Sequence, residues 1–191
     1  MVSAEGTYHW GVHGAAGLLL RAPWHDGSPA VLLQHRAAWS HQGGTWALPG
    51  GALDSHEEAS HAAVREAGAA VTGVVTCGEE AGLAAEQIAV RTTVVTAEVA
   101  GPHGPVWTYT TVVADAAELL ATVPNRESTE LRWVPEDRVG DLPLHPGFAA
   151  SWQRLRITAP PPPHDCDVGQ SHTVVVSERS TVLFHWCARG F

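Results

Sequence analysis

The sequence has few charged side chains and lacks long apolar runs. Charged residues make up 16% of the 191 residues and hydrophobic residues 45%, a balance typical of a globular protein. This length is sufficient for one domain with a buried core and a small appendage. The N-terminus lacks the basic-then-apolar pattern of a signal peptide, and no apolar run reaches the length of a membrane helix. We therefore expect a cytoplasmic protein that does not span or bind a membrane.

Cysteine and positive charge are also scarce. The three cysteines, Cys77, Cys166 and Cys187, show no Cys-x-x-Cys spacing, which is typical of proteins in a reducing compartment. The formal net charge of −9 argues against a broad surface for nucleic acid or anionic lipid. An acidic protein that acts on phosphates needs metal ions to offset the charge repulsion. The charge is therefore compatible with metal-dependent chemistry on a small phosphorylated molecule.

A spaced set of glycine, arginine and glutamate residues carries the functional signal. Gly51, Glu57 and the pair Arg65-Glu66 stand at the spacing Gly-x5-Glu-x7-Arg-Glu. A pair of glutamates belongs shortly after Glu66, but Glu79-Glu80 arrive ten positions late, after the inserted residues 69–78. Removing those ten residues restores the spacing Glu-x-x-Glu-Glu without a mismatch.

This spacing has a chemical reason. Glutamates at positions i, i+3 and i+4 lie on one face of a helix, which would join Glu66 to Glu79 and Glu80 once the gap is closed. Clustered carboxylates repel one another unless a hard cation neutralises them, and Mg²⁺ or Mn²⁺ suits such oxygen ligands. Arg65 can orient a neighbouring glutamate through paired hydrogen bonds. The Gly50-Gly51 pair allows a tight turn and close approach of the backbone to a ligand.

The inserted residues decide whether this cluster can form. A continuous helix through the insertion would move the glutamate pair about 15 Å along the axis and rotate it by roughly 80°. The β-branched residues between 71 and 76, with Gly73 and Gly78, disfavour such a helix. We expect the insertion to loop out and the glutamates to return to the face of Glu66. The alternative is a damaged or altered metal site.

The remaining pattern predicts an α/β domain with a mixed sheet over residues 1–158. Strands are expected at 15–20, 30–34, 88–98, 107–114 and 131–134, and helices at 57–68 and 146–156. Asp54 or Ser55 can cap the first helix. A Pro-rich linker at 159–163 precedes a tail, 164–191, with two β-rich segments that predict a hairpin. That hairpin could dock on the main sheet, pair with a second copy in a homodimer, or stay poorly ordered.

Further stretches extend the pattern beyond the spaced box. The segments 32–36, 43–51, 130–135 and 144–148, together with the box, resemble the actinobacterial type of Nudix hydrolase over roughly residues 8–156. The resemblance implies an α/β/α sandwich whose box helix binds a divalent metal, Mg²⁺ or Mn²⁺. It also implies hydrolysis of a nucleoside diphosphate linked to another moiety. Neither the insertion nor the tail belongs to the family pattern.

Individual roles follow from the resemblance position by position. Glu66, Glu79 and Glu80 are the implied metal ligands. Arg65 is the implied orienting residue and Glu57 a supporting carboxylate. Glu80, or a glutamate from a later loop, would accept the proton of the attacking water. The two later-loop candidates are Glu127 and Glu130, which could equally be solvated loop charges.

The expected substrate-side residues are Arg36, Trp46, Gly50 and Gly51. Trp39 and Trp46 both flank the Gly-rich approach to the box, so either one could stack on a base, although most tryptophans are core or interface residues. The leading hypothesis is a metal-dependent hydrolase of a phosphoanhydride in a nucleotide-type substrate. The alternative is a Nudix-fold protein without that activity, which binds a ligand or regulates another process.

Overall fold

The computed structural model describes residues 2–4, 7–9, 11–68, 87–100 and 106–157. Residues 1–156 form one compact unit and residues 157–191 a second, of which only Ile157 is described. Several predicted features lie outside the described residues: the proposed insertion at 69–78, Glu79 and Glu80, the linker at 159–163 and the hairpin tail at 164–191. No helix within the described ranges is both long and apolar enough to cross a membrane.

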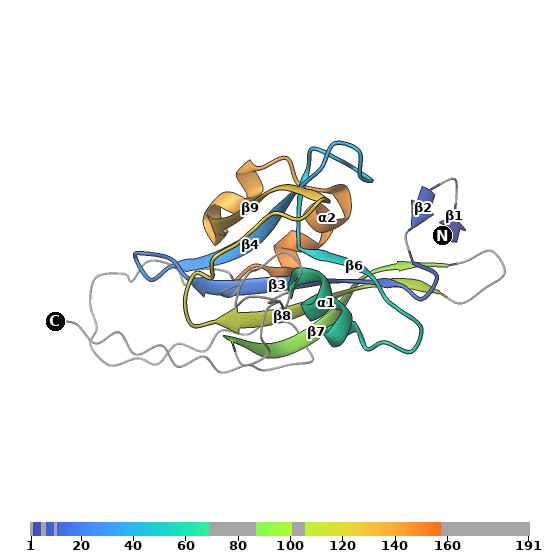
Figure 1. Cartoon of the computed structure of the whole chain (residues 1–191), viewed down its shortest axis with the longest axis horizontal. Coiled ribbons are helices and arrows are strands. Elements are labelled where there is room, and N and C mark those ends of the chain that lie inside the picture. Colours follow the sequence, from blue (N-terminus) through green and yellow to red (C-terminus); the bar gives the residue numbers. More distant parts are fainter. Residues whose placement is uncertain (1, 5–6, 10, 69–86, 101–105, 158–191) are drawn as a thin grey trace, which may run out of the picture. The chain divides into compact units, whose positions relative to one another are not determined.

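The first unit contains nine strands, a short 3₁₀ helix and two α-helices in its described part (Figure 1). In chain order they are β1 (Val2–Ala4), β2 (Thr7–His9), β3 (Ala15–Pro23), β4 (Pro29–Arg36), β5 (Trp46–Ala47), β6 (Gly50–Ala52), α1 (Ala59–Gly68), β7 (Ile88–Val99), β8 (Trp107–Ala116), β9 (Ser128–Pro135), the 3₁₀ helix η2 (Glu136–Asp141) and α2 (Pro146–Leu155).

Seven of these strands form a mixed sheet. Its main path runs β5-β4-β3-β8-β7, with β9 paired to β4 and β6 paired to β3. The β3–β8 pair is parallel, whereas the other strand pairs of this sheet are antiparallel. The strands β1 and β2 form a separate two-stranded sheet. The predicted mixed sheet is therefore confirmed.

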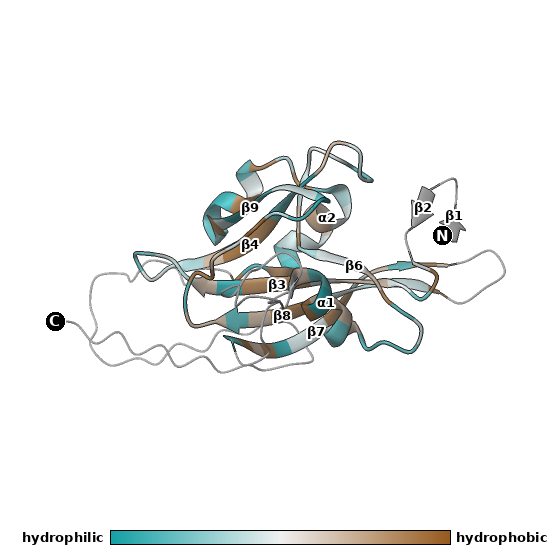
Figure 2. Cartoon of the chain, in the orientation of Figure 1, coloured by the Kyte–Doolittle hydropathy of each residue, from teal (hydrophilic) through white to brown (hydrophobic). Residues whose placement is uncertain are grey.

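Alternating side chains of β3 face the two layers of the core, as the period of two in a strand requires. Leu18 and Leu20 pack in one cluster with Ala62, Ala63 and Ala67 of α1. The intervening Leu19 packs in a second cluster with Phe148, Trp152 and Leu155 of α2. Figure 2 shows the resulting apolar band along β3. The helices thus lie on opposite faces of the sheet, and the expected α/β/α sandwich is confirmed.

The sheet divides at the end where β3 begins. Strands β3 and β4 pair only near their shared turn, from Arg21 opposite Val31 to Pro23 opposite Pro29. Beyond that point β6 takes the place beside β3, with Gly51 opposite Ala16, while β5 pairs with the far end of β4. The short strands after β4 therefore fill the space between diverging neighbours (Figure 1). This end of the sheet carries the site residues.

The long elements agree with the sequence predictions, but their ends differ. The first helix begins at Ala59 rather than at Glu57. The backbone N–H of Glu57 donates to the carbonyl of Asp54, and the side chain of Glu57 accepts from the backbone N–H of Asp54. These two reciprocal bonds make a turn that precedes the helix. The short elements β5, β6 and η2 were not predicted, because two to six residues show no usable periodicity.

Candidate functional site

The glycine pair of β6 makes room for two close contacts. A Cβ on Gly50 would collide with the backbone of Ala16 and Gly17, so this glycine allows β6 to approach β3. A Cβ on Gly51 would lie 2.5 Å from Cδ of Glu66, whose carboxylate therefore packs directly over the glycine. Neither position has a positive φ, so the requirement is space rather than a special turn. Gly50 and Gly51 therefore let the start of the box lie against β3 and against the Glu66 carboxylate of α1.

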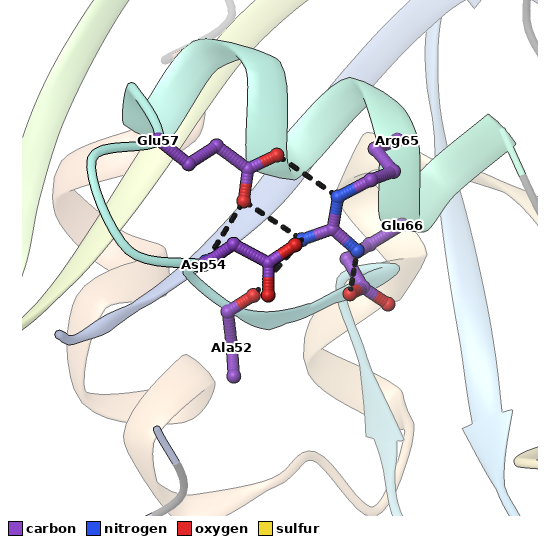
Figure 3. Close-up of polar contacts among 5 residues, drawn as sticks. All are labelled: Ala52, Asp54, Glu57, Arg65 and Glu66. Carbon is purple, nitrogen blue, oxygen red and sulfur yellow. Dashed lines mark hydrogen bonds and ion pairs between the residues drawn. The ribbon is translucent and has the colours of Figure 1, made fainter. Parts of the chain in front are cut away.

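Arg65 connects the turn before α1 to the helix itself (Figure 3). Its Nε and Nη2 donate to the two carboxylate oxygens of Glu57 at 2.9 and 2.8 Å, a bidentate pair. Nη2 also donates to the carbonyl of Ala52 at 3.1 Å, and Nη1 donates to Oε1 of Glu66 at 2.6 Å. Arg65 thus has the expected orienting geometry, and Glu57 supports it.

The charges of this group are stabilised by their contacts. Hydrogen bonds from Arg65, and then from the backbone N–H of Asp54, lower the pKa of Glu57 to about 2. The hydrogen bond with Glu57 contributes most to raising the pKa of Arg65. Both groups therefore stay ionised at any pH where the protein is expected to work. Glu66 consequently meets a permanent positive charge at one oxygen, while its second oxygen keeps lone pairs for a cation.

Glu66 is the one implied metal ligand within the described residues. Across the described ranges no group of three His, Cys, Asp or Glu side chains is placed to hold a metal ion. The other two implied ligands, Glu79 and Glu80, lie outside these ranges. A carboxylate oriented by arginine is an oxygen donor of the kind that Mg²⁺ and Mn²⁺ accept. Glu66, the first residue of the predicted donor set, therefore suits a divalent metal.

A second group of polar residues gathers where β4 ends and α2 begins. Nε of Arg36 donates to the carbonyl of His41 at 2.9 Å, and the rings of His41 and His145 lie 5.9 Å apart. His145 is the N-cap of α2, because its Nδ1 accepts a hydrogen bond from the backbone N–H of Gly147 at 3.1 Å. Residues more than a hundred positions apart therefore converge beside the diverging strands.

Burial, and then the nearby charges of Arg36 and His41, lower the pKa of His145 to about 4. Its ring is therefore neutral at neutral pH. Because Nδ1 accepts the capping bond, the ring proton resides on Nε2, which is left as a donor. Neither His41 nor His145 carries a role that the sequence pattern predicts. The adjacent Pro146, at the first position of α2, is the signal that could have identified His145 as a cap.

The two tryptophans beside the box occupy different environments. Trp46 is 5% exposed, and its ring packs between the ring of His35, 4.9 Å away, and the guanidinium of Arg132, 4.8 Å away. Its backbone carbonyl accepts from the N–H of His145 at 2.8 Å. Trp39, in contrast, is 70% exposed. The structure thus places Trp46 in the core, where it holds the start of α2.

The two glutamates predicted on a later loop are placed differently: Glu127 precedes β9, but Glu130 lies within that strand. Oε1 of Glu130 accepts from Nε of Arg132 at 2.7 Å, and Arg132 in turn lies over Trp46. Glu127 is exposed, and its carbonyl accepts from the backbone N–H of Ala37, just after Arg36. Glu127 therefore lies next to the group formed by Arg36, His41 and His145, called here the Arg36 cluster. Glu130, in contrast, forms an ion pair with Arg132.

The lowered pKa of His145 predicts a pH-dependent stability. A histidine whose folded pKa of about 4 lies below its unfolded value of about 6.5 stabilises the fold fully above pH 6.5. That contribution is lost as the pH falls from 6.5 to 4. We expect the wild type to lose about 1–2 kcal/mol relative to His145→Asn over this range, allowing for partial solvent screening. Urea unfolding at several pH values measures the difference.

His145→Asn is a suitable reference because asparagine also caps a helix but does not titrate. Parallel pH dependences of the two proteins would contradict a neutral, buried cap at this position.

Comparison with known proteins extends these observations over nearly the whole first unit. The family model of the NUDIX domain matches residues 12–155. A Mycobacterium tuberculosis protein named "Putative 8-oxo-dGTP diphosphatase 3" is 61% identical over 192 residues, covering 100% of this chain and 83% of its own length. The crystal structure of RenU, a Nudix hydrolase of M. smegmatis, is 71% identical with a TM-score of 0.72, covering 81% of this chain and 90% of its own.

A third relative is much longer than this chain. A Bifidobacterium longum protein named "Nucleoside triphosphate pyrophosphatase/Nudix hydrolase fusion protein" is 38% identical over 161 residues, which cover 80% of this chain and 29% of its own length. The family-model match, residues 12–155, includes the box, the mixed sheet and both helices of the described unit.

Proposed function

Because the chain belongs to the Nudix hydrolase family, as its box predicted, we propose that it hydrolyses a phosphoanhydride bond of a nucleoside triphosphate with the help of a divalent metal. The observation that carries the proposal is the Arg65 cluster. The guanidinium of Arg65, which donates two hydrogen bonds to Glu57, also binds the carboxylate of Glu66. Gly51, which has no side chain, leaves room for that carboxylate, so it is held in one orientation. The names of the relatives make 8-oxo-dGTP the first substrate to test.

Glu66 would hold the metal together with Glu79 and Glu80, provided that residues 69–78 loop out as expected. When bound, Mg²⁺ or Mn²⁺ would polarise the phosphoryl oxygens and supply an activated water. Arg65 would keep Glu66 facing this site, and Glu57 would keep Arg65 in place. The glycine backbone of β6 would allow the polyphosphate to approach closely.

A carboxylate is needed to accept the proton of the attacking water, and Glu80 is our first assignment. Glu127 is the second, because it is exposed beside Arg36. Glu130 is less suited to this role, since its carboxylate is already paired with Arg132 at 2.6 Å.

The Arg36 cluster would bind the base. Arg36 and the neutral ring of His145 supply hydrogen-bond donors, and a purine with carbonyl groups supplies acceptors. Oxidation of guanine at C8 adds one more carbonyl and converts N7 from an acceptor into a donor. A site with both a fixed cation and a neutral imidazole has the hydrogen-bonding groups to distinguish the N7–C8 edge of guanine from that of 8-oxoguanine. Trp46 would contribute indirectly, by positioning His145 through its backbone.

The test uses the full chain with 8-oxo-dGTP and dGTP in the presence of Mg²⁺, with products separated by ion-exchange chromatography. We expect conversion to a nucleotide with fewer phosphates, and at least roughly 100-fold loss of rate when the metal is chelated. Restoring Mg²⁺ should restore the rate. Glu80→Gln should lose most of the activity while circular dichroism shows an intact fold.

Unchanged turnover in Glu80→Gln would refute the assignment of a catalytic role to Glu80 and to the split box. The non-hydrolytic alternative predicts something different: a nucleotide complex that forms without Mg²⁺ or Mn²⁺ binding. Calorimetric titration with each metal, alone and with the nucleotide, separates the two hypotheses.

A further inference from the structure

We infer that Trp39 is the aromatic platform on which the base of the nucleotide stacks. The inference rests on the proposed function, because it concerns the base of the same substrate. The sequence pattern left both Trp39 and Trp46 as candidates for stacking and placed Trp46 among the substrate-side residues. The indole of Trp46 is 5% exposed and contacts His35 and Arg132, so its ring is already covered.

The loop that carries Trp39 is held closed by its own hydrogen bonds. The backbone N–H of Ser40 donates to the carbonyl of Ala37 at 2.9 Å, and that of Gly43 donates to the carbonyl of Ser40 at 2.9 Å. The N–H of Gly44 returns to the carbonyl of Arg36, also at 2.9 Å. Such a loop holds the backbone at Trp39 in place, which reduces the backbone entropy that a ligand must remove on binding.

The loop is also tied to the residues that would bind the base. Nε of Arg36 donates to the carbonyl of His41, and the ring of His41 lies 5.9 Å from that of His145. One residue, Ser40, separates Trp39 from His41 along the chain, so their Cα atoms are at most about 7 Å apart. An indole extends a comparable distance from its Cα. Trp39 is therefore within reach of a base held by this cluster.

An isolated exposed apolar side chain is common on protein surfaces and by itself indicates little. Trp39 differs because it is the largest side-chain type, is 70% exposed, and lies in the same loop as His41, whose carbonyl binds Arg36. Tryptophan presents a π face that accepts any planar base, whereas Arg36 and His145 read only the edges of that base. Stacking and edge recognition together would hold a base from two directions.

The test compares equilibrium binding of two probes to the full chain with Mg²⁺ present. One probe is the α,β-methylene analogue of dGTP, and the other is tripolyphosphate, which has no base. Calorimetry is run on the wild type, Trp39→Ala, Trp39→Phe and Trp24→Ala. Trp24 is a matched control because it lies in the turn between β3 and β4, at the opposite end of β3 from the site.

We expect Trp39→Ala to weaken binding of the dGTP analogue by roughly 5- to 100-fold and to leave tripolyphosphate binding within about twofold of the wild type. Trp39→Phe should recover most of the loss, and Trp24→Ala should behave like the wild type. Equal binding of the analogue by Trp39→Ala and wild type would overturn the inference. An equal loss for both probes would also overturn it, since the tryptophan would then only support the loop.

These outcomes are distinguishable from failure of the proposed function. A wild-type protein that binds the analogue through Trp39 but hydrolyses no nucleotide overturns the hydrolase assignment and supports the platform. A protein that hydrolyses nucleotides equally well, with equal KM, after Trp39→Ala keeps the assignment and loses the platform. Absence of any nucleotide binding by the wild type overturns both.

Discussion

Replacing Glu66 with glutamine is expected to lower kcat by roughly 100-fold or more, because the residue proposed as a metal ligand would lose its charge. Loss of a residue that merely orients a ligand typically costs 10- to 100-fold, and a ligand itself costs more. The shape at the site is retained, since glutamine fits the same space over Gly51. The ion pair with Arg65 is partly exposed, with 44% of the arginine and 28% of the glutamate side chain accessible. Its loss should therefore change stability by about 1 kcal/mol or less.

Steady-state kinetics with a nucleoside triphosphate, alongside thermal unfolding, measure the two effects separately. Glu58→Gln is the matched control, because Glu58 is an exposed carboxylate just before the same helix and has no role in the proposed mechanism. Its kcat should stay within about twofold of the wild type. A Glu66→Gln protein with wild-type kcat would remove Glu66 from the metal site and leave the Arg65 cluster as a purely structural feature.

The second large effect is expected at a buried ion pair that joins the sheet to both elements after β9. Arg21 of β3 and Glu136 of η2 have side chains only 9% and 5% exposed, with Nη2 and Oε1 3.1 Å apart. Nη2 of Arg21 also donates to the carbonyl of Leu155 at the end of α2, at 2.5 Å. Replacing one partner leaves the other charge buried without its ion pair. We expect Arg21→Met or Glu136→Gln to lower the free energy of unfolding by about 3–5 kcal/mol.

Urea unfolding of the single variants and of the double variant Arg21→Met/Glu136→Leu measures this effect. The double variant should recover much of the loss, because an apolar pair of similar volume carries no desolvation cost. Asp141→Asn provides a surface comparison: its partner Arg138 lies 3.6 Å away, both side chains are mostly exposed, and the loss should be about 0.5 kcal/mol. Single Arg21 and Glu136 variants that lose no more than Asp141→Asn would show that the buried pair is not a stabilising link.

Much of the fold was predictable because its signals are local. The apolar run that begins at Ala15 and the short segment 131–134 each lie within one strand, and β7 and α2 begin at the predicted residues. The start of α1 was predicted two residues early, since a reciprocal turn between Asp54 and Glu57 precedes it. The two-residue strand β5 was missed because so short a segment has no period to detect.

The site, like the fold, has a part that the sequence predicts and a part that it does not. The spacing of Gly51, Glu57, Arg65 and Glu66 spans sixteen positions and was readable as a motif. Their contacts depend on one turn and one helix, so the sequence pattern implies the geometry that the structure shows. The cluster of Arg36, His41 and His145 was not predictable as a cluster. It forms only when the end of β4 and the start of α2 come together across the sheet.

The sequence by itself determined the family, the order of the main helices and strands, and the residues of the box, because each of these is written in short-range spacing. The tertiary structure alone decided which tryptophan is covered and which is exposed. It also decided that Arg21 meets Glu136, 115 positions away, and that His145 is a neutral cap. The physical reason is that burial and desolvation depend on neighbours that are distant along the chain, and local periodicity carries no record of them.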